Sequence, residues 1–106
     1  MRRRNPSAGP QLQLQDVVMD EAAREVRRGG RLIELSAREF DLLRLLMMHP
    51  NQVLARDRIL DQVWGYNFFG DANNVEVYIR YLRQKLGDES HQLIQTVRGV
   101  GYRIKP

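Results

Sequence analysis

The chain has 106 residues, enough for one compact domain with a single core and too few for two ordinary domains. Hydrophobic residues make up 42% of the sequence, which argues against disorder. There is no cysteine, so a disulfide framework and a cysteine-built zinc site are excluded. Seventeen Lys and Arg against thirteen Asp and Glu give a formal net charge of +4, which permits a polyanionic partner without identifying one.

No apolar run approaches the roughly 20 residues that cross a bilayer, and the basic start lacks the apolar stretch of a secretion signal. We therefore expect a cytoplasmic protein with no membrane partner. Residues 1–10 combine three arginines with two prolines, which is typical of a flexible linker or an appended remnant. The remaining residues, 11–106, are predicted to form one folded domain.

The first predicted elements are short strands. Brief alternating and apolar stretches between Gln11 and Leu35 predict three or four antiparallel strands. Gly29 and Gly30 separate two of these stretches, and both glycines accept the positive φ of a tight hairpin turn.

A helix is predicted to follow at Ser36. Ser36 and Glu39 have the S-x-x-E spacing of a capping box, in which each side chain bonds the backbone N–H of the other residue. The run from Phe40 to Met48 is apolar almost all round, which indicates a helix buried on most sides. Pro50 is expected to end it at about His49.

Two further helices and a hairpin complete the prediction. Residues from about Arg56 to Trp64 form an amphipathic pattern that Gly65 is placed to end. Residues 73–86 have one narrow apolar stripe and end at Gly87, and the stripe consists of Val75, Ile79, Leu82 and Leu86. The stretch LIQTVRGVGYRIK then predicts two strands joined at residues 98–101, where Gly99 and Gly101 are expected to serve the backbone conformation.

Strands, three helices and a hairpin, in that order, predict an α+β winged helix-turn-helix fold with an N-terminal antiparallel sheet and a C-terminal β-hairpin wing. The third helix turns Asn73, Val77, Arg80 and Gln84 away from its apolar stripe, with Tyr81 at the edge of this face. The major groove of DNA admits one α-helix, and amide, guanidinium and aliphatic side chains can read its base edges. Taken alone, such a helix is also explained by a solvated polar face.

From Leu35 to Ile104 the sequence resembles the effector domain of OmpR/PhoB-type response regulators. The resemblance rests on three stretches, LSAREFDLLRLLMMHPNQVLARDRILDQVWGY, VEVYIRYLRQKL and LIQTVRGVGYRI, which cover about two thirds of the chain. It implies sequence-specific binding to double-stranded DNA, usually at tandem half-sites. It also implies a phosphorylated receiver domain on the N-terminal side and no enzymatic activity in this part.

The resemblance also implies a residue map. The positions that face the major groove are Asn73, Asn74, Glu76, Val77, Arg80, Tyr81 and Gln84. Trp64 and Arg83 match positions that touch phosphates, and Thr96, Arg98 and Tyr102 match the wing, with Arg98 the candidate for the minor groove. The segment that contacts RNA polymerase in the family corresponds to Gly65, Tyr66, Asn67, Phe68, Phe69, Gly70 and Asp71. Because dimerisation in the family depends largely on the receiver, the isolated domain is expected to be a monomer.

Some of these residues also have simpler explanations. Asn73 and Tyr81 stand where some relatives carry arginine, so base preference is not transferable. Trp64 and Thr96 can serve packing and strand formation alone, and Phe68 can pack beneath its loop. Arg83 can pair with an acid, although Glu76 is not at the spacing that a helix brings together.

The sequence offers little support for an enzyme or a metal-binding protein. The two histidines, His49 and His91, have no nucleophile or carboxylate at a triad-like spacing. Asp57 and Asp61 can share a cation, but a solvated helix face explains them more simply, and no metal or cofactor is predicted. A protein-interaction module using residues 66–69, and a single-stranded RNA binder, remain the alternatives to duplex DNA.

Overall fold

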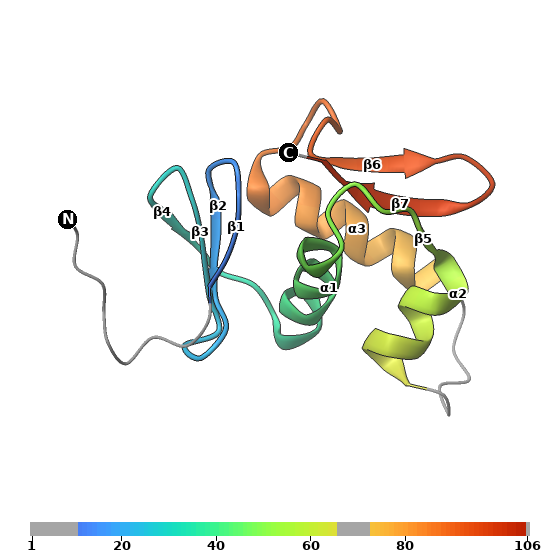
Figure 1. The fold of residues 1–106 in the computed structure, drawn as a ribbon, viewed down its shortest axis with the longest axis horizontal. Helices are drawn as coiled ribbons and strands as arrows, with labels where there is room; N and C mark the ends of the chain where they lie inside the picture. Colours follow the sequence, from blue (N-terminus) through green and yellow to red (C-terminus); the bar gives the residue numbers. More distant parts are fainter. Residues whose placement is uncertain (1–10, 66–72, 106) are drawn as a thin grey trace.

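The computed structural model describes residues 11–65 and 73–105, and it begins with a four-stranded antiparallel sheet (Figure 1). Its order is β1-β2-β3-β4, with each strand paired to the next along the chain. The strands are β1 (Gln11–Leu14), β2 (Val17–Asp20), β3 (Glu25–Arg28) and β4 (Arg31–Ile33). Gly29 and Gly30 both have positive φ between β3 and β4, as a tight turn requires, so the predicted hairpin is confirmed.

Helix α1 (Ala37–Met48) begins and ends where the sequence predicts. The Ser36 hydroxyl accepts a hydrogen bond from the Glu39 amide at 3.2 Å, and the Glu39 carboxylate accepts one from the Ser36 amide at 2.9 Å. This reciprocal capping box satisfies two amides that a helix N-terminus otherwise leaves unpaired. His49 is the C-cap, immediately before Pro50.

The second predicted helix has two parts. It starts as α2 (Arg56–Ile59) and continues as a π-helical segment, η1 (Leu60–Trp64), whose widened turn the sequence pattern did not predict. Gly65 ends it with a φ of 103°, a value that side chains rarely allow. Helix α3 (Asn73–Leu86) matches the predicted range, and Gly87 follows it with a φ of 73°.

The C-terminal wing is a three-stranded sheet rather than a simple hairpin. Strands β6 (Ile94–Val97) and β7 (Gly101–Ile104) pair as predicted, and β5 (Leu54–Ala55) adds to the other side of β7. The order is therefore β5-β7-β6, which leaves β6 as an edge strand. Strand β5 was not predicted, because two residues are too few to show the alternation of a strand.

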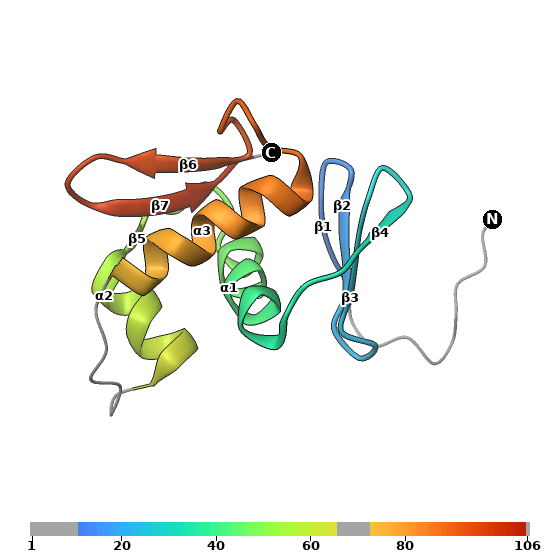
Figure 2. The same ribbon diagram turned by 180° about the vertical axis from the view of Figure 1, so that it is seen from behind.

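Helix α1 lies between the N-terminal sheet on one side and α3 with the wing on the other (Figures 1 and 2). Each layer contributes fully buried side chains to one hydrophobic core, including Met19, Leu43, Ile59, Leu82 and Ile104. Within the described residues, no helix has the length and apolar character needed to span a membrane. The core holds α3 with one face inward and the other free.

An ion pair between a buried carboxylate, Glu39, and an exposed side chain, Lys85, joins the start of α1 to the end of α3. Glu39 is 4% exposed, and its carboxylate accepts hydrogen bonds from the Ser36 amide and, at 2.7 Å, from Lys85 Nζ. Burial alone raises the pKa of Glu39, but the hydrogen bonds and the charge of Lys85 outweigh it and lower the pKa below its ordinary value. The folded protein therefore favours the ionised carboxylate.

Glu39→Gln is expected to lower the free energy of unfolding by about 1–3 kcal/mol at pH 7, because the acceptor for Lys85 and the Ser36 amide loses its charge. A carboxyl with a depressed folded-state pKa stabilises above its unfolded pKa and loses this contribution as pH falls through the folded value. The difference between the two proteins should therefore shrink below about pH 4. Urea unfolding at pH 7 and pH 3 measures it, with Asp41→Asn, from the exposed pair with Arg24, as the control. A difference independent of pH would contradict the prediction.

Candidate nucleic-acid interface

Helix α3 has a buried stripe and an opposite polar face. Val75, Ile79, Leu82 and Leu86 are all 2% exposed or less, which confirms the predicted inward stripe. On the other side Arg80 and Gln84 are exposed, Val77 and Asn74 are half-buried, and Tyr81 is 40% exposed. The side chain of Asn73 lies outside the description. The face that the sequence assigns to base contacts is therefore open at most of its described positions.

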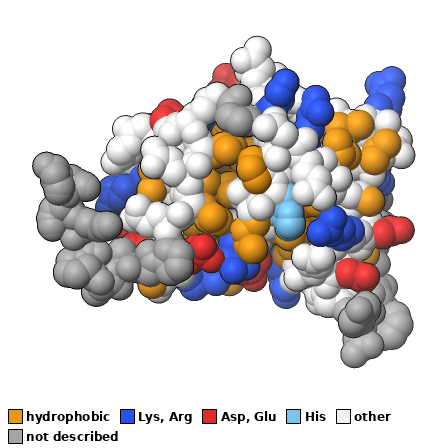
Figure 3. Space-filling model, in the orientation of Figure 1, with side chains coloured by type: hydrophobic (Ala, Val, Ile, Leu, Met, Phe, Trp, Pro, Cys, Tyr) orange, Lys and Arg blue, Asp and Glu red, His pale blue; other side chains and the backbone are white. Residues whose placement is uncertain are grey.

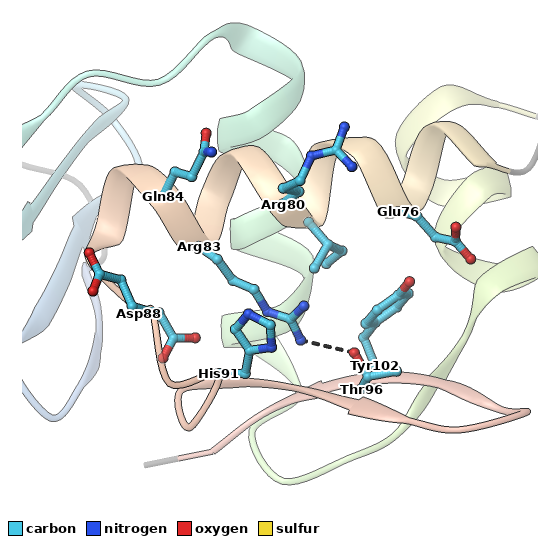
Figure 4. Close-up of a pocket in the computed structure, with 10 residues that line it drawn as sticks. Glu76, Arg80, Arg83, Gln84, Asp88, His91, Thr96 and Tyr102 are labelled. Atoms are coloured by element: carbon cyan, nitrogen blue, oxygen red, sulfur yellow. Dashed lines mark hydrogen bonds between the residues drawn. The ribbon is translucent and has the colours of Figure 1, made fainter.

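Arg80 is the most available cation of this face. Within residues 11–65 and 73–105 its guanidinium donates no hydrogen bond and forms no ion pair. Figure 4 shows Arg80 and Gln84 pointing away from the wing, whereas Arg83 points toward it. An exposed guanidinium keeps all its donors for a partner, and guanine offers the two acceptors that it matches best.

Glu76, the acid among the predicted groove residues, is paired with the preceding helix. Its Oε2 lies 3.2 Å from Nη1 of Arg56, at the first position of α2, and both side chains are partly exposed. The pair joins the beginning of α2 to the first turn of α3. Glu76 thus has a partner that sequence spacing did not suggest, and a neutralised carboxylate repels phosphates less.

Arg83 contacts the wing directly. Its Nε and Nη2 donate to the carbonyl oxygen of Ile94 at 3.1 and 2.8 Å, and Nη2 also donates to the hydroxyl of Thr96 at 2.9 Å (Figure 4). Burial lowers the pKa of Arg83, while the nearby Asp88 and Tyr102 oppose this shift. A guanidinium remains charged at any ordinary pH, so Arg83 carries a positive charge between α3 and β6.

A groove of about 570 Å³ separates α3 from the wing, and Figure 4 shows the side chains that line it. They include Arg80 and Arg83 of α3, His91 of the following loop, and Thr96 and Tyr102 of the wing. Tyr102 is 5% exposed, and burial first and the Glu76 charge second raise the pKa of its hydroxyl. The phenol therefore stays protonated and able to donate a hydrogen bond.

Trp64 belongs to an aromatic series that the sequence analysis did not find. Its ring meets that of Tyr78 edge to face at 5.2 Å, and Tyr78 meets Tyr81 in the same manner at 5.7 Å. The guanidinium of Arg38 lies 5.5 Å from the Trp64 ring, and its Nη1 donates to the Val63 carbonyl. Trp64 is half-buried, so it takes part in packing and also reaches the surface. Aromatic neighbours on different elements have no signature in the sequence.

The wing tip is open to solvent, and the segment before α3 is described only at Gly65 among the predicted contacts. Arg98 and Thr96 are exposed, and Val100 beside Arg98 is 52% exposed. Gly65 is half-buried at the end of η1. The other residues predicted to contact RNA polymerase, Tyr66 to Asp71, lie outside the described residues. In the part of the chain that the structure describes, no group of three or more His, Asp or Glu side chains is arranged to hold a metal ion.

The face opposite to α3, seen in Figure 3, has a different character. Hydrophobic side chains lie at its centre, and charged side chains of both signs surround them. Helix α3 lies behind α1 in this orientation and comes to the front in the view from behind (Figure 2). A helix-turn-helix whose second helix is exposed beside a small antiparallel sheet defines the winged helix-turn-helix class of DNA-binding domain.

The chain belongs to the family described as transcriptional regulatory protein, C terminal, whose model matches residues 30–104. It is 53% identical over 98 residues to the transcriptional regulatory protein YkoG of Bacillus subtilis, and this match covers 92% of the chain and 43% of YkoG. It is 46% identical to the response regulator MprA of Mycobacterium sp. strain KMS, over 99% of the chain and 47% of MprA. The chain thus spans less than half the length of these curated relatives.

Solved structures agree with the fold. The DNA-binding domain of Klebsiella pneumoniae RstA, in complex with the RstA box, has a TM-score of 0.84 at 33% identity, over 92% of the chain and 99% of that domain. The DNA-binding domain of Escherichia coli CpxR has a TM-score of 0.80 at 31% identity, over 92% of the chain and 97% of that domain. These findings confirm the winged helix-turn-helix fold and the resemblance to OmpR/PhoB-type response regulators.

Proposed function

We propose that this chain is the effector domain of a two-component response regulator and binds double-stranded DNA at specific sequences. Helix α3 enters the major groove, and the β6–β7 wing lies at the adjacent minor groove. The observation that carries this proposal is the free polar face of α3, where Arg80 and Gln84 are exposed while the opposite stripe is fully buried. A major groove is wide enough for this helix and presents a distinct donor and acceptor pattern for each base pair.

The base contacts come from the open face of α3. Arg80 recognises guanine through two hydrogen bonds, Gln84, Asn74 and Asn73 suit adenine, and Val77 and Tyr81 offer apolar surface to a thymine methyl. Glu76 can accept from a cytosine amine if its pair with Arg56 opens.

The remaining predicted contacts position the domain on the duplex. Arg98 at the wing tip is the cation for the minor groove, where negative potential is strongest when the groove is narrow. Thr96 and Tyr102 are the other proposed contacts of the wing. Trp64 is a proposed phosphate neighbour, and such contacts fix register without reading sequence. Arg83 is the further phosphate candidate from the resemblance.

The proposed partners follow from the same role. A single module of this size binds DNA weakly, so two copies on tandem half-sites gain affinity together. An N-terminal receiver domain in the full-length protein controls this pairing, and residues 65–71 are the proposed contact with RNA polymerase. Residues 1–10 are then the linker, and the isolated domain is a monomer. We also propose that the domain is not an enzyme and that it acts in the cytoplasm.

Selection of random duplex DNA on the purified domain tests the proposal. The expected result is enrichment of short half-sites in direct repeat, with centres about one helical turn apart. The affinity for the enriched site should exceed that for unrelated duplex by a factor of roughly 10³ or more at physiological salt. Binding without sequence preference, which weakens equally for all duplexes as salt rises, would overturn the proposal, because phosphate attraction alone explains it.

A further inference from the structure

Ile94, the first residue of β6, has its backbone N–H and C=O bonded by side chains at and just after the end of α3. Strand β6 lies at the edge of the wing sheet. The Lys105 amide donates to the Leu93 carbonyl, so by the alternation of an antiparallel pair the N–H and C=O of Ile94 point away from β7. Buried backbone groups on a free edge need other partners.

Two charged side chains supply these partners. The Ile94 amide donates to Oδ2 of Asp88 at 2.8 Å, and the Ile94 carbonyl accepts from Nε and Nη2 of Arg83. Asp88 is 4% exposed, and its Oδ1 also accepts from the amides of Gln92 and Leu93, both at 3.0 Å. The turn between α3 and β6 is therefore organised around one buried carboxylate.

Arg83 extends this attachment along the strand. Its Nη2 also donates to the Thr96 hydroxyl, two residues beyond Ile94 (Figure 4). One guanidinium therefore bonds both the Ile94 carbonyl and the Thr96 side chain of β6. Nε and Nη2 of Arg83 therefore both donate hydrogen bonds within the protein itself. The planar fork of arginine satisfies both acceptors at once, which a lysine ammonium on its flexible stem does not reproduce.

We infer that Arg83, Asp88, Ile94 and Thr96 form a clamp that sets the position of the wing relative to α3, with Arg83 a positioning residue for the wing. This inference rests on the proposed function and deepens it. A helix in the major groove and a wing in the minor groove reach their base pairs together only if the spacing between them is fixed. A clamp formed before binding removes the cost of ordering the wing on DNA.

The clamp predicts a role for Arg83 that differs from a phosphate contact. A phosphate contact depends on positive charge, so Arg83→Lys would keep most of the affinity. A clamp depends on the forked geometry, so Arg83→Lys and Arg83→Met should both weaken specific binding by about tenfold. Removing a phosphate contact also reduces the salt slope by about 0.9, whereas loosening a clamp leaves the slope unchanged.

The first experiment uses the free domain and involves no DNA. Hydrogen exchange of the β6 and β7 amides should become about tenfold faster in Arg83→Lys and in the milder variant Thr96→Val, while the amides of α1 keep their rates. Arg44→Lys is the matched control, because Arg44 pairs with Glu21 near the N-terminal sheet, and its wing amides should exchange as in the wild type. Unchanged wing exchange in Arg83→Lys would overturn the inference.

The second experiment measures binding of the same variants to the selected site at several salt concentrations. Equal losses for Arg83→Lys and Arg83→Met, with the wild-type salt slope, support the clamp. Wild-type affinity for Arg83→Lys, with a reduced slope for Arg83→Met, overturns it in favour of a phosphate contact. If the wild-type domain itself shows no preferred sequence, the proposed function fails instead, and the exchange experiment still decides whether the clamp exists.

Discussion

Gly101→Ala is expected to lower the free energy of unfolding by about 3 kcal/mol or more. Strand β5 pairs antiparallel with β7, and Ala55 is the residue paired with Gly101. A Cβ built at Gly101 lies 2.8 Å from the carbonyl carbon of Leu54 and still closer to the carbonyl oxygen. Both obstacles are backbone atoms, so relief requires moving β5 away from β7 rather than turning a side chain.

Gly99→Ala is the matched control, two residues away in the same wing. Gly99 has a φ of 78° and no atom within 4 Å of an added Cβ, so its substitution costs only the strain of a left-handed conformation, about 1–2 kcal/mol. Urea unfolding of both variants and the wild type measures the two values. Equal destabilisation by the two substitutions would show that the wing accommodates a side chain at Gly101 and that the close approach of β5 is not limiting.

Of the two glycines of the wing, the sequence pattern accounts for one, Gly99, and only the tertiary structure accounts for Gly101. Both were predicted to serve the backbone conformation, and for Gly99 this is confirmed by its positive φ. Gly101 has another reason, because it sits where two backbones approach closely. That approach depends on β5, a two-residue strand some 45 positions earlier in the chain, which no local pattern indicates.

Helix boundaries were predictable because their causes are local. The capping box of Ser36 and Glu39 fixes the start of α1, and Gly87 fixes the end of α3. The hydrophobic period of α3 likewise placed Arg80 and Gln84 outward, since an inward stripe determines the opposite face. The second helix was predicted with correct ends, but its π-helical part was not, because five residues are too few for a changed period to show in the sequence.

The partners of the site residues were not predictable, because they join distant elements. Glu76 pairs with Arg56, Lys85 with Glu39, and Arg83 with the wing. None of these pairs is separated by the three or four residues at which one helix brings side chains together. The sequence could therefore name Arg83 as a charged residue near the interface, but only tertiary structure shows that its donors are directed at β6.

Arg80→Ala is expected to cost about 1–3 kcal/mol of binding free energy on the preferred site, a loss of roughly five- to 150-fold. The side chain is exposed and has no partner in the described part of the chain, so its removal should change the free energy of unfolding by less than about 0.5 kcal/mol. The loss of binding free energy would then reflect a contact with DNA and not a less stable domain. It should also blur the preference at one or two base pairs, because a guanidinium that reads a guanine contributes nothing at other positions.

Arg98→Ala is expected to behave differently from Arg80→Ala, which distinguishes recognition of bases from electrostatic attraction to any DNA. Under the proposed function the cation at the wing tip contacts the minor groove, where A·T and T·A pairs present nearly the same groups, so its loss should weaken all sequences more evenly. Binding of both variants to the selected site and to its single-base substitutions, with Arg44→Ala as the control, measures the two patterns. If Arg80→Ala leaves the preference at every base pair intact, α3 is not the reading helix. The exposed polar face would then be merely solvated, which was the alternative that its sequence left open.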